Sequence, residues 1–160
     1  MKEIKFYKVN DEYGFMSNFA PYPFSDGSRI WPTSEHLFSS TKVLVPQIQE
    51  KIRQIASPMD TALEGRNRQN PLRSDWEEVK DEVMLQALRM KFSQNPEIVR
   101  ELLATGDANI IEHTRNDAYW ADGGDGTGKN KLGLLLMQVR EELKNLHSVT
   151  SPLAIPTISC

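Results

Sequence analysis

A run of apolar residues at helical spacing, in the middle of the chain, constrains the fold more than any other feature. The run spans about five turns of an α-helix and consists of Val79, Val83, Leu85, Leu88 and Phe92. Ser74 followed by Glu77, or Asp75 followed by Glu78, predicts a capping box just before the run. The pattern therefore predicts a long amphipathic helix.

Other stretches carry shorter helix and strand signals. Caps, prolines and apolar spacing predict helices at about 33–45, 47–56, 58–63, 96–104 and 131–146. Residues 3–9 and 29–31 suit strands that pair antiparallel, and residues 109–113 form a strand or an extended segment. We expect an α+β fold: a predominantly α-helical single domain over residues 1–147 with a small antiparallel β-sheet. A tail at 148–160 either packs along the surface or stays mobile.

Charge and composition exclude several classes of protein. The 160 residues carry a net charge of -3, so no general basic surface for nucleic acid is expected. No apolar run approaches the roughly 18 residues of a membrane span, and the first residues lack the apolar core of a signal peptide, which favours a cytoplasmic protein. The single cysteine, Cys160, excludes an intrachain disulfide and a cysteine-based metal cage. Catalysis must then use oxygen, nitrogen or carboxylate groups.

Residues 116–133 form the most unusual polar segment. The segment combines aromatic, acidic, amide and glycine residues, and its candidate ligand-binding members are Asn116, Asp117, Trp120, Asp122 and Asn130. Its Gly126-Thr127-Gly128-Lys129 run lacks the spacing of a P-loop, although backbone N–H groups at 130–132 could hold an anion at the start of the last helix. Together with residues 31–36, the segment predicts a polar pocket.

Glu35 and Lys42 are the candidate catalytic pair. Seven residues separate them, which corresponds to an angular offset of about 20° and about 10 Å along a helix, so they share a face with Phe38 and Ser39. An ordinary solvated helix face is the alternative interpretation. His36 is expected to be a hydrogen-bonded structural residue, and no metal site is predicted.

Aromatic and basic residues supply further candidates with two interpretations each. Trp31, Trp76 and Trp120 either belong to the core or stack on a flat heterocycle, and Trp120 is the one whose polar loop favours stacking. Arg66, with Arg68 and Arg73, is either solvated or grips a phosphate.

Several motifs occur in one order along most of the chain. They are Tyr13-Gly14-Phe15-Met16-Ser17-Asn18-Phe19, Trp31-Pro32-Thr33-Ser34-Glu35-His36, Gly65-Arg66, Pro71-Leu72-Arg73, the Trp76 helix, Lys91-Phe92, Asn116-Asp117-Ala118-Tyr119-Trp120 and Gly128-Lys129-Asn130-Lys131-Leu132-Gly133. In this order, from about Phe6 to Leu146, they resemble the NADAR family, also called YbiA-like proteins.

The resemblance implies an N-glycosidase without a cofactor. Some family members hydrolyse phosphoribosylamino-pyrimidine intermediates of riboflavin biosynthesis, with release of ribose 5-phosphate, and others remove ADP-ribose from modified guanine. The small phosphorylated ribosyl-heterocycle is the favoured substrate; nucleic acid enters only under the ADP-ribosyl-guanine alternative, and a non-catalytic ADP-ribose binder is the third hypothesis. The oligomeric state is not predicted.

The resemblance also assigns roles to residues. It makes Lys42 the amine that forms an imine with the ring-opened sugar and Glu35 its acid/base partner; alternatively, Lys42 stays protonated and stabilises charge. The substrate-binding candidates are Asn18, Trp31, Arg66, Trp76, Asn116, Asp117, Trp120, Asp122 and Asn130. The chain departs from the family pattern at residues 37–41, where an aromatic and glutamine-containing run is common, and at Ala121, where glycine is frequent.

Overall fold

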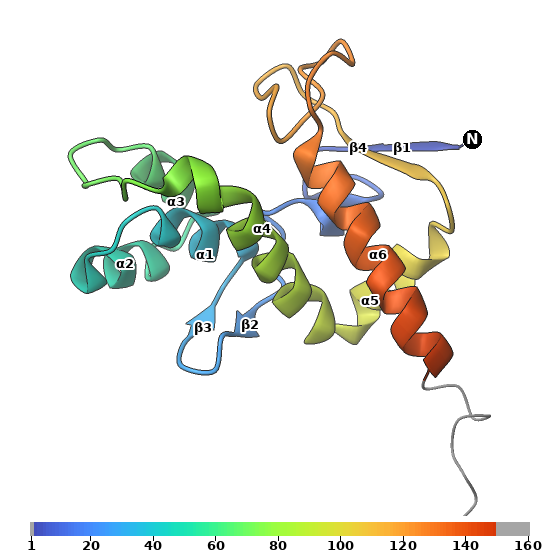
Figure 1. Cartoon of the computed structure of the whole chain (residues 1–160), viewed down its shortest axis with the longest axis horizontal. Coiled ribbons are helices and arrows are strands. Elements are labelled where there is room, and N and C mark those ends of the chain that lie inside the picture. Colours follow the sequence, from blue (N-terminus) through green and yellow to red (C-terminus); the bar gives the residue numbers. More distant parts are fainter. Residues whose placement is uncertain (1, 150–160) are drawn as a thin grey trace, which may run out of the picture.

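The long helix α4 (Trp76–Ser93) crosses the middle of the molecule and connects two groups of elements (Figure 1). The computed structural model describes residues 2–149. On one side of α4 lie α1 (Ser34–Thr41), α2 (Pro46–Arg53) and α3 (Pro58–Gly65). On the other side lie α5 (Pro96–Ala104), α6 (Lys131–Val149), β1 (Glu3–Phe6) and β4 (Asn109–Glu112). The predominantly helical α+β prediction is confirmed.

Within residues 2–149, four short strands form two separate two-stranded sheets. β1 pairs in parallel with β4, with Glu3 opposite Asn109, and β2 (Phe24–Ser25) pairs antiparallel with β3 (Ile30–Trp31). The predicted antiparallel pairing of residues 3–9 with 29–31 was therefore wrong. β3 instead pairs with β2, which is close to it in sequence and joined to it by the turn at Asp26. The Asp26 carboxylate accepts the backbone N–H groups of Ser28 and Arg29 at 2.8 Å each.

Most helix starts agree with the predictions, whereas two details differ. Thr33 and Ser57 cap α1 and α3 as expected. However, α1 ends at Thr41 rather than at 45, with Lys42 as its C-cap, and Pro46 is the first residue of α2. The capping box before α4 is absent, because the Asp75 carboxylate instead accepts two hydrogen bonds from the Arg73 guanidinium, at 2.6 and 3.0 Å.

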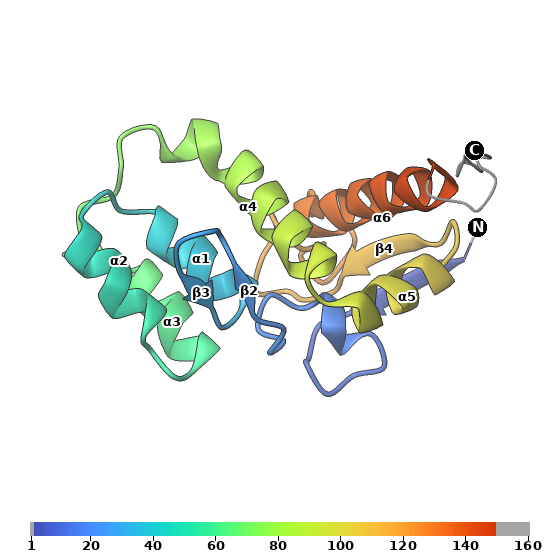
Figure 2. The ribbon, with the colours of Figure 1, turned by 90° about the horizontal axis from the view of Figure 1, so that it is seen from below.

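The core lies where α4, α5, α6 and β4 meet, and Figure 2 shows these elements side by side. Its fully buried side chains include Phe92, Ile98, Ile110, Leu132 and Leu136. Lys91 is also fully buried and donates to the carbonyl oxygens of Phe15 and Ser17, at 2.7 and 3.0 Å, so α4 fixes the 14–19 segment from behind. Among residues 2–149, no helix is both long enough and apolar enough to cross a membrane.

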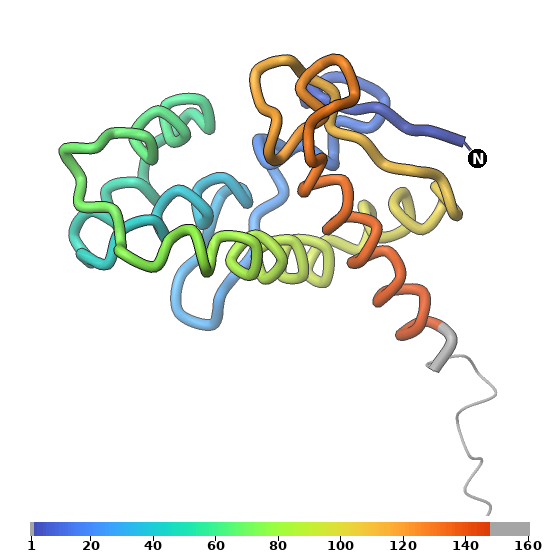
Figure 3. The backbone as a smooth tube through the Cα atoms, turned by 45° about the horizontal axis from the view of Figure 1, so that its top comes forward, coloured from blue at the N-terminus to red at the C-terminus, as the bar shows by residue number. Residues whose placement is uncertain are grey.

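The segment between β4 and α6 arches over the N-terminal part of the chain (Figure 3). Asn116 donates a side-chain hydrogen bond to the Tyr7 hydroxyl at 3.2 Å, which joins this segment to the residues just after β1. The tail predicted at 148–160 begins within the end of α6, and from residue 150 onward it lies outside the described residues.

Candidate active site

A cavity of about 690 Å³ lies where α1, α3, β4 and the loop after β4 come together. Its lining includes seven of the residues predicted from sequence: Asn18, Glu35, Lys42, Arg66, Asn116, Asp117 and Trp120. Residues 7–9, Phe19, Met59 and Met84 complete much of the remaining wall. Pockets of 300–1,000 Å³ are the usual size for small-molecule sites. The cavity is therefore the candidate active site.

The start of α1 is held rigidly at the edge of this cavity. The backbone N–H of Glu35 donates to the carbonyl oxygen of Asn18 at 3.1 Å, and the Ser34 hydroxyl donates to Asn18 Oδ1 at 2.8 Å. The Ser39 hydroxyl donates to Glu35 Oε1 at 3.4 Å, one turn further along the helix. These contacts orient the Glu35 carboxyl toward the cavity.

Gly65 brings the end of α3 against α1. A Cβ atom at Gly65 would lie 2.7 Å from Ser39 Oγ and 2.9 Å from Ser39 Cβ, distances that real Cβ atoms do not adopt. The absence of a side chain therefore allows the two helices to approach. Arg66 follows directly, lines the cavity, and has no carboxylate partner among residues 2–149.

Burial governs the ionisation of both catalytic candidates. It raises the pKa of Glu35 from 4.5 to about 7, an effect that the nearby charges of Lys42 and Arg66 oppose. Burial lowers the pKa of Lys42; Arg68 and Arg66 lower it further, whereas Glu35 raises it. Burial therefore favours the neutral form of each group, and the attraction between Glu35 and Lys42 acts in the opposite direction.

Aromatic rings form one wall of the site. The Trp120 ring packs edge-on against Phe38, with 5.3 Å between centroids, and Phe38 packs against Trp76 at 5.0 Å. Lys42 Nζ lies 5.3 Å from the centroid of the Phe38 ring. Trp76 stands behind Phe38 and is only 6% exposed, so it supports the wall without lining the cavity.

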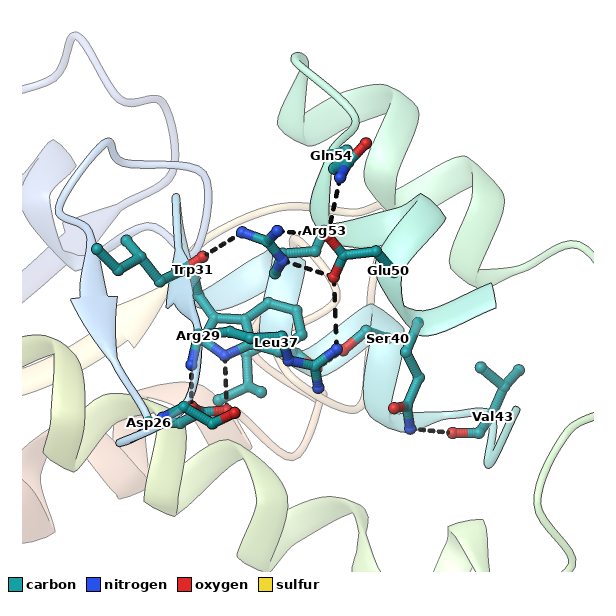
Figure 4. A network of polar contacts seen from close by, with 12 residues as sticks. Asp26, Arg29, Trp31, Leu37, Ser40, Val43, Glu50, Arg53 and Gln54 are labelled. Carbon is teal, nitrogen blue, oxygen red and sulfur yellow. Dashed lines mark hydrogen bonds and ion pairs between the residues drawn. The ribbon is translucent and has the colours of Figure 1, made fainter. Parts of the chain in front are cut away.

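Trp31 also lies outside the cavity lining. It is 1% exposed, and its indole N–H donates to Asp26 Oδ2 at 2.9 Å, as the network in Figure 4 shows. A buried indole N–H needs such a partner. The contacts of Trp31 therefore match the core interpretation of this residue.

Asp122 and Asn130 lie behind the site and hold its backbone. The Asp122 carboxylate binds His113 Nδ1 at 2.7 Å and accepts the backbone N–H groups of Thr114 and Gly124. Asn130 Oδ1 accepts the backbone N–H of Glu112 at 3.0 Å. Both residues line a second, smaller cavity of about 410 Å³ beside the β1–β4 sheet.

The expected anion site at the start of α6 was wrong. The backbone N–H groups of residues 130, 131 and 132 donate to the carbonyl oxygens of Ala121, Tyr119 and Trp120, each at 3.0 Å. These donors close the loop onto α6 and are not available to a ligand.

Glu112, at the end of β4, lines the cavity but was not singled out from the sequence. Burial raises its pKa from 4.5 to about 8, and the charges of Asp117, Glu35 and Asp122 act in the same direction. The alternation of side chains along a strand could have identified Glu112. It follows the fully buried Ile110 by two residues and therefore lies on the same, inward face of β4.

His36 is fully buried, with Nδ1 2.7 Å from Thr33 Oγ1 and Nε2 2.7 Å from the carbonyl oxygen of Ile55. Both ring nitrogens thus have structural partners. In the described part of the chain, no three His, Cys, Asp or Glu side chains are grouped so as to hold a metal ion.

Comparison with known proteins gives consistent matches over most of the chain. The NADAR domain model matches residues 5–144. N-glycosidase YbiA of Shigella boydii is 54% identical over 140 residues, which cover 88% of each chain. A riboflavin biosynthesis protein of Vibrio vulnificus is 40% identical, and the match covers 88% of this chain and 38% of that protein. The NMR structure of Escherichia coli YbiA matches with a TM-score of 0.85 and 50% identity, covering 92% of this chain and 88% of that one.

Proposed function

The chain belongs to the NADAR family and, like its named relatives, is an N-glycosidase; we propose that it hydrolyses the ribose–nitrogen bond of phosphoribosylamino-pyrimidine intermediates of riboflavin biosynthesis. The products are ribose 5-phosphate and the free aminopyrimidine. The observation that carries the proposal is the meeting of Glu35, Lys42, Arg66 and Trp120 in one cavity.

The charges in the cavity match the parts of such a substrate. Arg66 provides positive charge for the phosphate, and its planar donor geometry suits phosphate oxygens. Trp120 provides an aromatic surface for the flat ring. The ribose then lies between them, beside Glu35.

Lys42 is the nucleophile in this proposal. Attack on C1′ of the ring-opened sugar requires a neutral amine, and both burial and the neighbouring arginines favour that form. The resulting lysine imine is hydrolysed by water to release the sugar phosphate. Glu35, whose pKa of about 7 allows it to give and accept protons near neutral pH, moves protons on and off the reacting amine and water.

The test is release of ribose 5-phosphate from the phosphoribosylamino-pyrimidine, measured by mass spectrometry for wild type, Lys42→Ala and Glu35→Gln. We expect release by wild type, with a loss of about a hundredfold or more in each variant. Borohydride added during turnover should attach the sugar to Lys42 and leave Lys42→Ala unlabelled. Turnover without a Lys42 adduct would overturn the imine route and favour Lys42 as a fixed cation.

A folded wild type that releases nothing from these compounds would overturn the proposed substrate. ADP-ribosylated guanine is then the next compound to assay, because it also carries a phosphorylated ribose bonded to an exocyclic nitrogen. Inactivity on both, with retained binding of ADP-ribose, would indicate a binding module.

A further inference from the structure

Glu112 is an unpaired carboxyl group in the wall of the cavity. Its side chain has no hydrogen bond or ion pair with any residue of the described range 2–149, although its backbone is fixed on both sides. Asn130 Oδ1 accepts its N–H at 3.0 Å, and its carbonyl oxygen accepts the backbone N–H of Asp122 at 2.9 Å. A rigid backbone therefore presents a carboxyl group without a protein partner to the cavity.

The charged groups of the cavity are arranged in a definite order. The strongest charge effects on Lys42 come from Glu35 and from Arg68, Arg66 and Lys80. Those on Glu112 come only from the acids Asp117, Glu35 and Asp122. Glu35 responds to both groups, to Lys42 and Arg66 on one side and to Asp117 on the other. Glu35 thus stands between a cationic end and an acidic end.

A phosphoribosylamino heterocycle has a matching order. If its phosphate lies at the cationic end and its scissile bond beside Glu35, the leaving nitrogen and the ring lie at the acidic end. We propose that Glu112 is a second catalytic residue, the general acid that protonates the leaving nitrogen, while Glu35 serves the amine and the water. This inference rests on the proposed function.

The step balances as follows. In the ring-opened sugar, C1′ is doubly bonded to the heterocycle nitrogen. Lys42 Nζ forms a bond to C1′, the π electron pair goes to the heterocycle nitrogen, and the proton that Lys42 Nζ loses reaches that nitrogen through Glu35. The remaining C1′–N single bond then breaks, its electron pair goes to the heterocycle nitrogen, and the lone pair of Lys42 Nζ completes the lysine imine. The proton of the Glu112 carboxyl transfers to the same nitrogen, so the heterocycle leaves as a neutral amine and Glu112 becomes a carboxylate. The water that later hydrolyses the lysine imine supplies the proton that restores the acid.

The surroundings of Glu112 keep its proton in place at neutral pH. Burial raises the pKa of Glu112 to about 8, and the neighbouring acids Asp117, Glu35 and Asp122 act in the same direction. The titratable or charged groups around it are Asp117, Asp122 and the Asp122-bound His113 on the loop, Glu35 and Lys42 on or next to α1, and Tyr7 and Lys8 after β1. A general acid at this position can therefore hold its proton at neutral pH.

The first test compares the pH dependence of kcat/KM in wild type and Glu112→Gln on the phosphoribosylamino-pyrimidine. We expect wild-type activity to decline above about pH 8, as the acid loses its proton. Glu112→Gln should be about a hundredfold slower at the optimum, and its activity should not decline in that range. Glu12→Gln, which removes an exposed carboxylate, is the matched control and should keep the wild-type profile.

The second test varies the leaving group. N-aryl ribosylamine 5-phosphates carry anilines that differ in how well they leave without a proton. In Glu112→Gln the loss of kcat/KM should be large for the 4-methoxyaniline substrate and small for the 4-nitroaniline substrate. Only the departure of 4-methoxyaniline depends strongly on protonation by the acid. A purely structural role of Glu112 would lower both by the same factor.

The outcomes separate the two proposals. An equal loss for all leaving groups, or a variant that keeps the alkaline decline, would overturn the role of Glu112 and leave the N-glycosidase proposal standing. If the phosphoribosylamino-pyrimidine is cleaved and the aniline substrates are not, the role of Glu112 is decided by whether Glu112→Gln loses the alkaline decline of kcat/KM. A wild type that cleaves no substrate would overturn the proposed function and the role of Glu112 with it.

Discussion

Asn130 holds Glu112 in place: its side-chain Oδ1 accepts the Glu112 backbone N–H at 3.0 Å, and its Nδ2 donates to the carbonyl oxygen of Ile110 at 2.9 Å. One side chain at the start of α6 thus substitutes for a neighbouring strand along β4. Asn130 also has a φ of 51°, a conformation that asparagine adopts more readily than most residues.

The two roles of Asn130 can be separated by substitution. Asn130→Gly keeps the backbone conformation and loses the two hydrogen bonds, and we expect it to cost about 1–3 kcal/mol of folding stability. Asn130→Ala should cost more, because alanine is strained at this φ. Both should lower kcat through displacement of Glu112. Thermal unfolding and steady-state kinetics test this, and equal stability of the two variants would contradict the strain argument.

Gly65→Ala should separate α3 from α1. The new methyl group would collide with Ser39 Oγ and Cβ, and overpacking of this kind typically costs about 1–3 kcal/mol. Because Arg66 moves with the end of α3, we also expect a higher KM for the phosphorylated substrate. Ser39→Gly removes both colliding atoms, so the double variant should recover part of the lost stability in urea denaturation. Additive losses would show that the collision is not the cause.

The free energy of unfolding should carry a pH-dependent contribution from Glu112. The folded chain binds this proton more tightly than the unfolded chain, since the pKa rises from 4.5 to about 8. The folded state therefore holds more protons within that window, and the stability that Glu112 contributes falls as pH rises through it. The stability of wild type minus that of Glu112→Gln should then decrease from about pH 5 to about pH 9 in urea denaturation.

The difference between the two proteins is the quantity to measure, because Lys91 acts in the opposite direction. Burial lowers the pKa of Lys91 to about 7, so its contribution to stability rises with pH above that value. Lys91 is present in both proteins and cancels in the difference. Parallel stability curves for the two proteins would contradict the raised pKa of the Glu112 carboxyl.

Trp120 and Trp31 should respond differently to substitution. Trp120→Ala removes the proposed stacking surface, and we expect KM to rise about ten- to hundredfold. Trp31→Phe loses the hydrogen bond to Asp26 and should cost about 1 kcal/mol of stability with KM unchanged. Kinetics and thermal unfolding on both variants provide the comparison. A raised KM in Trp31→Phe at unchanged stability would place this residue in the site after all.

Local patterns predicted the helices well because each carries its own signals. The apolar spacing from Val79 to Phe92 identified α4, and the hydroxyls of Thr33 and Ser57 identified two helix starts. The pairing of β1 with β4 was not predictable in this way. It depends on which distant strand shares the buried face of Ile4 and Phe6, and the sequence near β1 contains no such information.

The candidate site shows the same division. Glu35 and Lys42 could be placed on one helix face by spacing alone, whereas Asp122 and Asn130 were grouped with them because polar loop residues often contact ligands. In the structure, the side chains of Asp122 and Asn130 instead accept hydrogen bonds from backbone N–H groups of the chain around Glu112. A single glutamate in a four-residue strand can be predicted to line a site only when the inward face of that strand is known.

The parallel pairing of β1 with β4 also affects when the enzyme becomes active during its synthesis. β1 leaves the ribosome about a hundred residues before its partner β4. Closing so long a loop is slow compared with forming the helices. The wall that carries Glu112 therefore forms only after β4 has been synthesised, and a nascent chain that already contains Glu35 and Lys42 still lacks this part of its cavity.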